Sequence, residues 1–80
     1  MPKLRVLSGG QVLRILAEFG FEPCGQRGSH IKLRRIVSGE NQTLTVPNHR
    51  EMDRGTLHAL YRQASRFVPD SDLRPRFFTE

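Results

Sequence analysis

Hydrophobic side chains change their spacing twice along this chain, and that change constrains the fold more than any other feature of the sequence. Apolar residues recur every three or four positions within residues 12–19 and again within residues 57–68, the period of a helix with one buried face. Between these stretches, residues 30–37 alternate between apolar and polar, the period of a half-buried strand. The order predicts an α+β fold, α-β-β-β-α, in which both helices cover one face of a sheet and the other face stays open.

Both predicted helices carry signals at their first residues. A helix is predicted over residues 8–20, because Ser8 and Gln11 have the spacing of a capping box, in which each side chain accepts a hydrogen bond from the other's backbone N–H. A second helix is predicted from about residue 54 to residue 66, with Asp53 as its N-cap.

Three strands are predicted between the helices, over residues 21–26, 30–37 and 43–47. Pro23 cannot donate a hydrogen bond to a sheet, so the first strand belongs at a sheet edge or begins there. The polar residues 38–42 form the loop of a hairpin between the second and third strands. The alternation fails at Arg35 and Ile36, which indicates a bulge or the strand end at that point. The result is a three-stranded antiparallel sheet.

The chain of 80 residues is long enough for one small domain. We expect residues 1–80 to form it, with a core over about residues 7–68 and a C-terminal tail over residues 69–80 whose docking the sequence leaves open. The apolar runs fall short of the roughly 20 residues that a membrane span needs, and the N-terminus lacks the apolar stretch of a secretory signal. These features predict a cytoplasmic protein with no membrane partner. The single cysteine, Cys24, fits a reducing compartment and is expected to be partly buried.

The chain has 13 Lys and Arg residues against 8 Asp and Glu, which gives a formal net charge of +5. This excess favours a polyanionic partner such as nucleic acid, although it could serve solubility alone. The sequence contains no phosphate-binding glycine loop, Cys-x-x-Cys pair or Gly-x-Ser-x-Gly motif. His30, His49 and His58 stand in separate predicted elements without the spacing of metal ligands, so we predict neither a metal nor another cofactor.

His30 shares the open face of its predicted strand with Lys32 and Arg34, just past a turn that contains Arg27. An imidazole has an unperturbed pKa of about 6.5 and can take a proton from a ribose 2′-hydroxyl at neutral pH. Cationic neighbours would stabilise the charge that builds on the attacked phosphate. The pattern makes His30 a candidate general base for RNA cleavage, although a single histidine on a strand is also compatible with an ordinary surface residue.

Two further residues near this strand have more than one interpretation. Gly28 can be a turn residue that needs a positive φ, or its missing side chain can let a phosphate approach the backbone. His49 can end the loop after the third predicted strand, or it can lie beside the second strand and assist His30.

Four short motifs occur in order between residues 7 and 66. They are Ser8-Gly9, Phe19-Gly20-Phe21, Gly28-Ser29-His30, and Thr45-Val46-Pro47 followed by His49 and Gly55-Thr56-Leu57. In this order the sequence resembles the HicA (YcfA-like) toxins of toxin-antitoxin systems. Two features depart from the family pattern. Ile31-Lys32-Leu33 follows the histidine where many members carry another histidine or an aromatic residue, and the tail beyond Ala64 differs from the usual short ending.

The resemblance implies a fold like a double-stranded-RNA-binding domain and a ribonuclease that cleaves mRNA without needing the ribosome. It implies that His30 is the catalytic residue and that a cognate HicB antitoxin covers the His30 face and can itself bind operator DNA. The residues that we expect to bind the RNA phosphates are Arg27, Gly28, Ser29, Lys32 and Arg34. Two alternatives stay open: a non-catalytic module that binds duplex RNA by its shape, and a protein-interaction domain.

Overall fold

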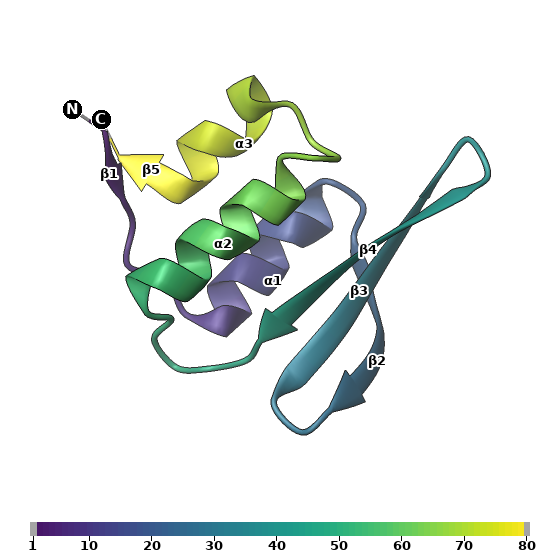
Figure 1. The fold of residues 1–80 in the computed structure, drawn as a ribbon, viewed down its shortest axis with the longest axis horizontal. Helices are drawn as coiled ribbons and strands as arrows, with labels where there is room; N and C mark the ends of the chain where they lie inside the picture. Colours follow the sequence, from purple (N-terminus) through teal and green to yellow (C-terminus); the bar gives the residue numbers. More distant parts are fainter. Residues whose placement is uncertain (1, 80) are drawn as a thin grey trace.

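A computed structural model describes residues 2–79 and contains a three-stranded antiparallel sheet with helices against one of its faces (Figure 1). The elements, in chain order, are β1 (Lys3–Leu4), α1 (Gly9–Glu18), β2 (Glu22–Arg27), β3 (His30–Val37), β4 (Glu40–Pro47), α2 (Arg54–Ala64), α3 (Asp70–Phe77) and β5 (Phe78–Thr79). The predicted α+β arrangement of helix, three strands and helix is confirmed for α1 through α2.

The capping box predicted for the first helix is present. The Ser8 Oγ accepts a hydrogen bond from the backbone N–H of Gln11 at 3.1 Å, and the Gln11 Oε1 accepts one from the backbone N–H of Ser8 at 2.8 Å. The helix ends at Glu18, and Gly20 follows with a φ of +92°, a conformation that L side chains rarely adopt. Asp53 caps α2 as predicted, with its Oδ2 at 3.4 Å from the Thr56 backbone nitrogen.

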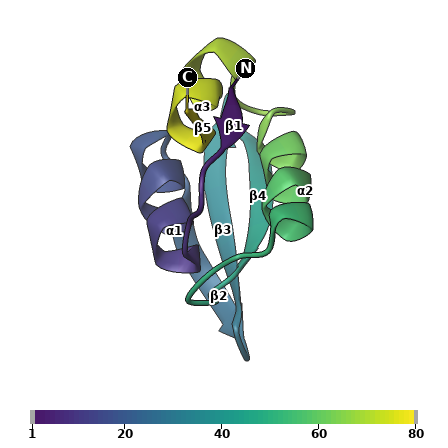
Figure 2. The same cartoon turned by 90° about the vertical axis from the view of Figure 1, so that its left-hand side faces the viewer.

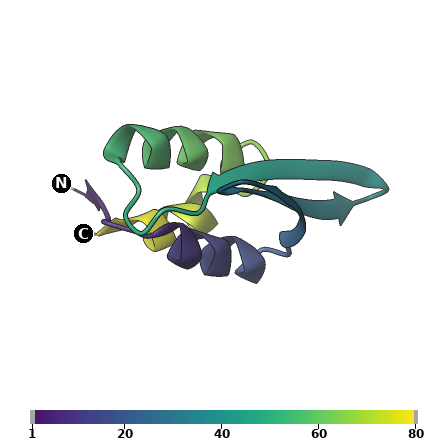
Figure 3. The same cartoon turned by 90° about the horizontal axis from the view of Figure 1, so that it is seen from below.

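The sheet has the strand order β2-β3-β4, so β3 is central and β2, which contains Pro23, lies at an edge as predicted. The β3–β4 turn is shorter than predicted, because only Ser38 and Gly39 form it and β4 begins at Glu40. Both turn residues have positive φ, 51° and 80°, which matches the type I′ turn whose twist suits a two-residue hairpin. Figure 3 shows the resulting β3–β4 hairpin extending beyond the helices.

The prediction of a bulge or the strand end at Arg35 and Ile36 was wrong, because β3 pairs with β4 without interruption through Val37. The irregularity lies instead in β2, between Pro23 and Gly25, where the register with β3 shifts by one residue. Cys24, at this irregularity, is exposed, contrary to the expectation that it would be partly buried.

Arg35 interrupts the apolar pattern of β3, and its side chain connects the sheet to the C-terminal ends of α1 and α2. Its guanidinium donates hydrogen bonds to the backbone oxygens of Phe19 and Phe67 at 3.0 and 2.9 Å, and its Nε donates to the Gln42 Oε1 at 2.8 Å. The guanidinium carbon, Cζ, also lies 4.8 Å from the ring centre of Phe21. A polar residue on the covered face is therefore a structural cross-link.

Helices α1 and α2 lie against the same face of the sheet, as Figure 2 shows. The core between them is built from the buried residues Val12, Leu16, Phe21, Leu33, Val46, Leu57, Leu60 and Ala64, among others. The alternate residues of β3 and β4 face away from the helices and are exposed, so the predicted open face of the sheet is confirmed. None of the helices in residues 2–79 is long and apolar enough to cross a membrane.

The C-terminal tail, whose docking the sequence left open, packs on the helices. Leu73 and Phe77 of α3 are fully buried, and β5 pairs with β1 in an antiparallel two-stranded ribbon. The ring of Tyr61 meets those of Phe77 and Phe78 edge-on, with ring centres 5.4 and 5.0 Å apart. The core therefore extends beyond residue 68, and the two described ends of the chain lie together (Figure 1).

Candidate functional site

The register of the sheet places the predicted site residues of β3 on its open face. Side chains alternate along a strand, so His30, Lys32 and Arg34 point away from the helices, and all three are exposed. Arg27 of β2 is the direct cross-strand partner of His30. On the other side of β3, Lys32 pairs with Thr45 of β4. The geometry therefore brings an arginine, a histidine and a lysine together at one end of the open face.

Gly28 and Ser29 form the two-residue turn between β2 and β3. Gly28 has a φ of +59°, and apart from Gly28 itself and its two chain neighbours, no residue has an atom within 4 Å of the place where a Cβ would stand. The Gln26 side chain donates to the Gly28 carbonyl at 2.9 Å, and the Ser29 carbonyl accepts from the Asn48 backbone N–H at 2.7 Å. The positive φ accounts for a glycine in this turn, and the turn is tied to the loop after β4.

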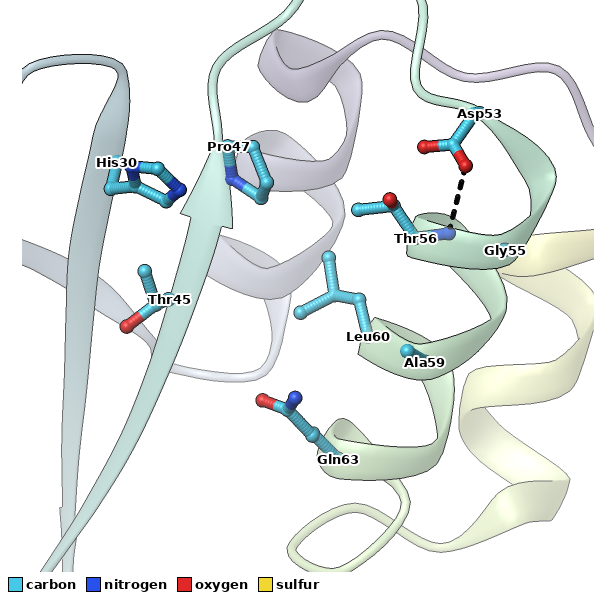
Figure 4. A pocket seen from close by; sticks show the side chains of 9 residues that line it. All are labelled: His30, Thr45, Pro47, Asp53, Gly55, Thr56, Ala59, Leu60 and Gln63. Atoms are coloured by element: carbon cyan, nitrogen blue, oxygen red, sulfur yellow. Dashed lines mark hydrogen bonds between the residues drawn. The ribbon is translucent and has the colours of Figure 1, made fainter.

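His30 and Thr45 lie between two adjoining hollows. The first, the cationic hollow, has a volume of about 310 Å³ and is also lined by Gly25, Gln26, Arg27 and Lys32. The second, the β4–α2 groove, has a volume of about 430 Å³ and lies between the sheet edge and α2 (Figure 4). Its strand side consists of His30, Thr45 and Pro47. Its helix side consists of Asp53, Gly55, Thr56, Ala59, Leu60 and Gln63.

The two hollows differ in charge. Arg27 and Lys32 line the cationic hollow, and no carboxylate is among its lining residues. The β4–α2 groove has no Lys or Arg among its lining residues, and it contains Asp53. Hydrogen bonding by Thr56 lowers the pKa of the Asp53 carboxyl below its ordinary value, although desolvation offsets part of this effect. Asp53 carries a negative charge at neutral pH. His30 therefore lies between a hollow lined by cations and a groove lined by one carboxylate.

The remaining predicted site residues lie outside these two hollows. Arg34 is on the same face, two residues beyond Lys32, where it pairs with Glu22 and Thr43. His49 is exposed in the loop after β4 and lines neither hollow, although this loop touches the Gly28-Ser29 turn. Within residues 2–79, no three His, Cys, Asp or Glu side chains gather as metal ligands would.

Sequence reasoning missed the contribution of α2 to the site. Thr56, Ala59 and Gln63 follow the helical spacing and form a stripe of small and polar residues beside the buried stripe of α2. Such a stripe resembles an ordinary solvated helix face, and only the position of α2 beside the β4 edge makes it part of a groove. Figure 4 shows the Gln63 side chain extending from α2 toward β4.

Gly9, which the sequence analysis named only as part of a motif, lies in close contact with the loop after β4. A Cβ at this position would lie 2.7 Å from the Asn48 Cα and from the Pro47 carbonyl oxygen, too close for any real contact. The Gly9 backbone N–H also donates to the His49 carbonyl at 2.8 Å. The missing side chain thus lets the start of α1 press against the loop that holds the Gly28-Ser29 turn.

Comparison with known families gives one match over this part of the chain. A family model described as the HicA toxin of bacterial toxin-antitoxin systems matches residues 9–65. The matched region runs from the first residue of α1 past the end of α2 and contains every residue that lines the two hollows. No curated protein and no solved structure gives a significant match.

Proposed function

Because the chain belongs to the HicA toxin family of bacterial toxin-antitoxin systems, we propose that this toxin is a metal-independent endoribonuclease that cleaves mRNA with His30 as its catalytic residue. The observation that carries the proposal is the position of His30 between a hollow lined by two cations and a groove that can accept the rest of a nucleotide. His30 is exposed there, so a ribose can reach its imidazole.

In this mechanism His30 takes the proton from a ribose 2′-hydroxyl, and the 2′-oxygen attacks the adjacent phosphorus. The bond from phosphorus to the 5′-oxygen breaks, and the leaving oxygen receives a proton from the imidazolium that the first step formed. The products are a 2′,3′-cyclic phosphate and a 5′-hydroxyl. Arg27 and Lys32 stabilise the charge on the phosphate during the attack, while Arg34 and the Gly28-Ser29 turn bind the neighbouring backbone.

A gel assay with end-labelled, largely single-stranded RNA in the presence of EDTA tests this function. We expect the purified toxin to cut the RNA and His30→Ala to leave it intact while remaining folded by circular dichroism and still binding RNA. A product with a 5′-phosphate would reject the mechanism, and loss of cutting in EDTA would reject metal independence. Intact RNA with the wild-type protein, together with tight duplex binding by both proteins, would instead favour a non-catalytic RNA-binding module.

The family implies an antitoxin partner. We propose that a HicB-type antitoxin covers the His30 face and presents carboxylates to the cations there, because the chain carries a net charge of +5 and these side chains are exposed. Both the antitoxin and the mRNA would be met in the cytoplasm. Lys32→Glu should weaken capture of the purified antitoxin, and unchanged capture would place the antitoxin on another surface.

A further inference from the structure

The β4–α2 groove adjoins the proposed catalytic residue, and its chemistry differs from that of a phosphate site. A ligand whose phosphate lies in the cationic hollow passes His30 and Thr45 to enter the groove, since those two residues line both.

Charge favours the cationic hollow over the groove as the place for a phosphate. Asp53 is exposed and the pKa of its carboxyl is lowered, chiefly by hydrogen bonding from Thr56, so it is ionised, and the lining contains no Lys or Arg. Phosphate oxygens would be repelled there and attracted to Arg27 and Lys32 on the other side of His30. The part of a nucleotide that suits the groove is therefore its uncharged base.

The lining of the groove also matches a base in shape and polarity. Pro47 and Ala59 provide apolar surface for the flat face of a ring, and Thr45, Thr56 and Gln63 provide hydrogen-bonding groups around it. The Gln63 amide carries both donors and an acceptor and extends toward β4 across the groove (Figure 4). Single-stranded RNA is read in this way, through stacking and hydrogen bonds to the edges of unpaired bases.

We propose that the β4–α2 groove is a nucleobase subsite that gives the toxin its sequence preference, an inference that rests on the proposed ribonuclease function. The 2′-hydroxyl that attacks must reach His30, so the base in the groove is the one on the same ribose, on the 5′ side of the cleaved bond. Gln63 and Thr56 of α2 then act as specificity-determining residues, whereas Arg27 and Lys32 bind every sequence alike.

Two matched replacements of an alanine by leucine test the subsite and leave Arg27 and Lys32 unchanged. Ala59 is exposed on α2 and lines the groove, so Ala59→Leu fills part of it. Ala17 is also exposed, on α1, and lines neither hollow, which makes Ala17→Leu the control. Both changes are made in the non-cleaving His30→Ala protein, and binding of short single-stranded RNAs with one abasic position is followed by fluorescence anisotropy.

In the parent protein and in Ala17→Leu, removal of one particular base should weaken binding about tenfold, the size expected for a lost set of stacking and hydrogen-bonding contacts. In Ala59→Leu the same removal should change binding by less than about twofold, because the base no longer enters the filled groove in the intact RNA either. Equal sensitivity in all three proteins, or no sensitive position in any, would overturn the subsite.

Failure of the ribonuclease proposal gives a different result. If the wild-type toxin leaves RNA intact while the abasic experiment still shows a base held in the groove, then the subsite stands and the catalytic role of His30 falls. If cutting depends on His30 but Ala59→Leu keeps the full sensitivity to the abasic position, then the catalytic role stands and the subsite falls.

Discussion

Two adjacent arginines in β3 lie on opposite faces of the sheet and have different surroundings. Arg34 is exposed on the open face, across from Glu22 and Thr43. Arg35 is half-buried on the covered face, where it donates to two backbone carbonyls and to Gln42. An arginine is thus free to meet a ligand at one position and holds the fold together at the next, and the difference lies in which groups surround it.

This contrast extends to the two faces as wholes. Residues on the covered face contact the helices, so we expect substitutions there to change stability first. Residues on the open face contact solvent, so we expect substitutions there to change RNA cleavage or binding while the free energy of unfolding stays nearly constant.

His30→Ala should give the largest effect on the open face. Loss of a general acid or base typically reduces a rate by about 100- to 10,000-fold, so kcat/KM for RNA cleavage should fall about 1,000-fold. The side chain is exposed, and the free energy of unfolding should stay within about 0.5 kcal/mol of wild type. Single-turnover cleavage and urea unfolding measure the two quantities. A large loss of stability would show that His30 also belongs to the folded framework.

Arg35→Leu should give the largest effect on the covered face. The substitution removes three hydrogen bonds and leaves the carbonyls of Phe19 and Phe67 without this donor, so the free energy of unfolding should fall by about 3 kcal/mol. Arg34→Leu is the matched control and should change it by less than about 0.5 kcal/mol while weakening RNA binding. Urea unfolding of both variants gives the comparison. Equal losses would mean that the two faces do not divide stability from binding.

Hydrophobic periodicity predicted the faces of the sheet, and the capping signals at Ser8 and Asp53 predicted the starts of both helices, because these features depend on residues close in sequence. The sequence also selected His30, Lys32 and Arg27 as neighbours, since alternation in a hairpin fixes which side chains share a face.

The features that sequence reasoning missed depend on contacts between distant residues. The break at Arg35 resembles a bulge until the carbonyls of Phe19 and Phe67 are known to lie within reach. Ala59 and Gln63 line the β4–α2 groove only because α2 packs beside the edge of β4. In the same way, docking of the tail requires Tyr61 to meet Phe77, which local spacing cannot show.

Gly9→Ala tests whether the stability of the covered face and RNA cleavage on the open face are independent of each other. Its Cβ would collide with the loop after β4, and that loop holds the turn next to His30. We expect the free energy of unfolding to fall by about 2 kcal/mol and RNA cleavage to fall as well. Gly10→Ala, with its nearest contact at 3.8 Å, should instead raise stability by about 0.5 kcal/mol. Normal cleavage by a destabilised Gly9→Ala would mean that the loop does not position the site.

Lys32→Gln should show that the cationic hollow binds phosphate rather than base. Neutralising one phosphate contact to single-stranded RNA should reduce the slope of log Kobs against log salt concentration by about 0.7. Arg62→Gln removes an exposed charge on α2 that lines neither hollow, so it should leave this slope nearly unchanged. Anisotropy titrations at several salt concentrations give the slopes. The same slope for both variants would indicate that the open face does not direct the backbone of the RNA.

Asp53→Asn should give the smallest effect, because Asp53 is exposed at the start of α2. The native state lowers the pKa of its carboxyl, chiefly through hydrogen bonding by Thr56, so Asp53 contributes stability above its ordinary pKa of 3.8 and loses that contribution as the pH falls through the lower folded value. Asn keeps the cap but cannot titrate. The difference in free energy of unfolding between wild type and variant should be constant at neutral pH and shrink in acid. Urea unfolding at a series of pH values measures it, and a difference that does not change with pH would show that the cap does not depend on the charge.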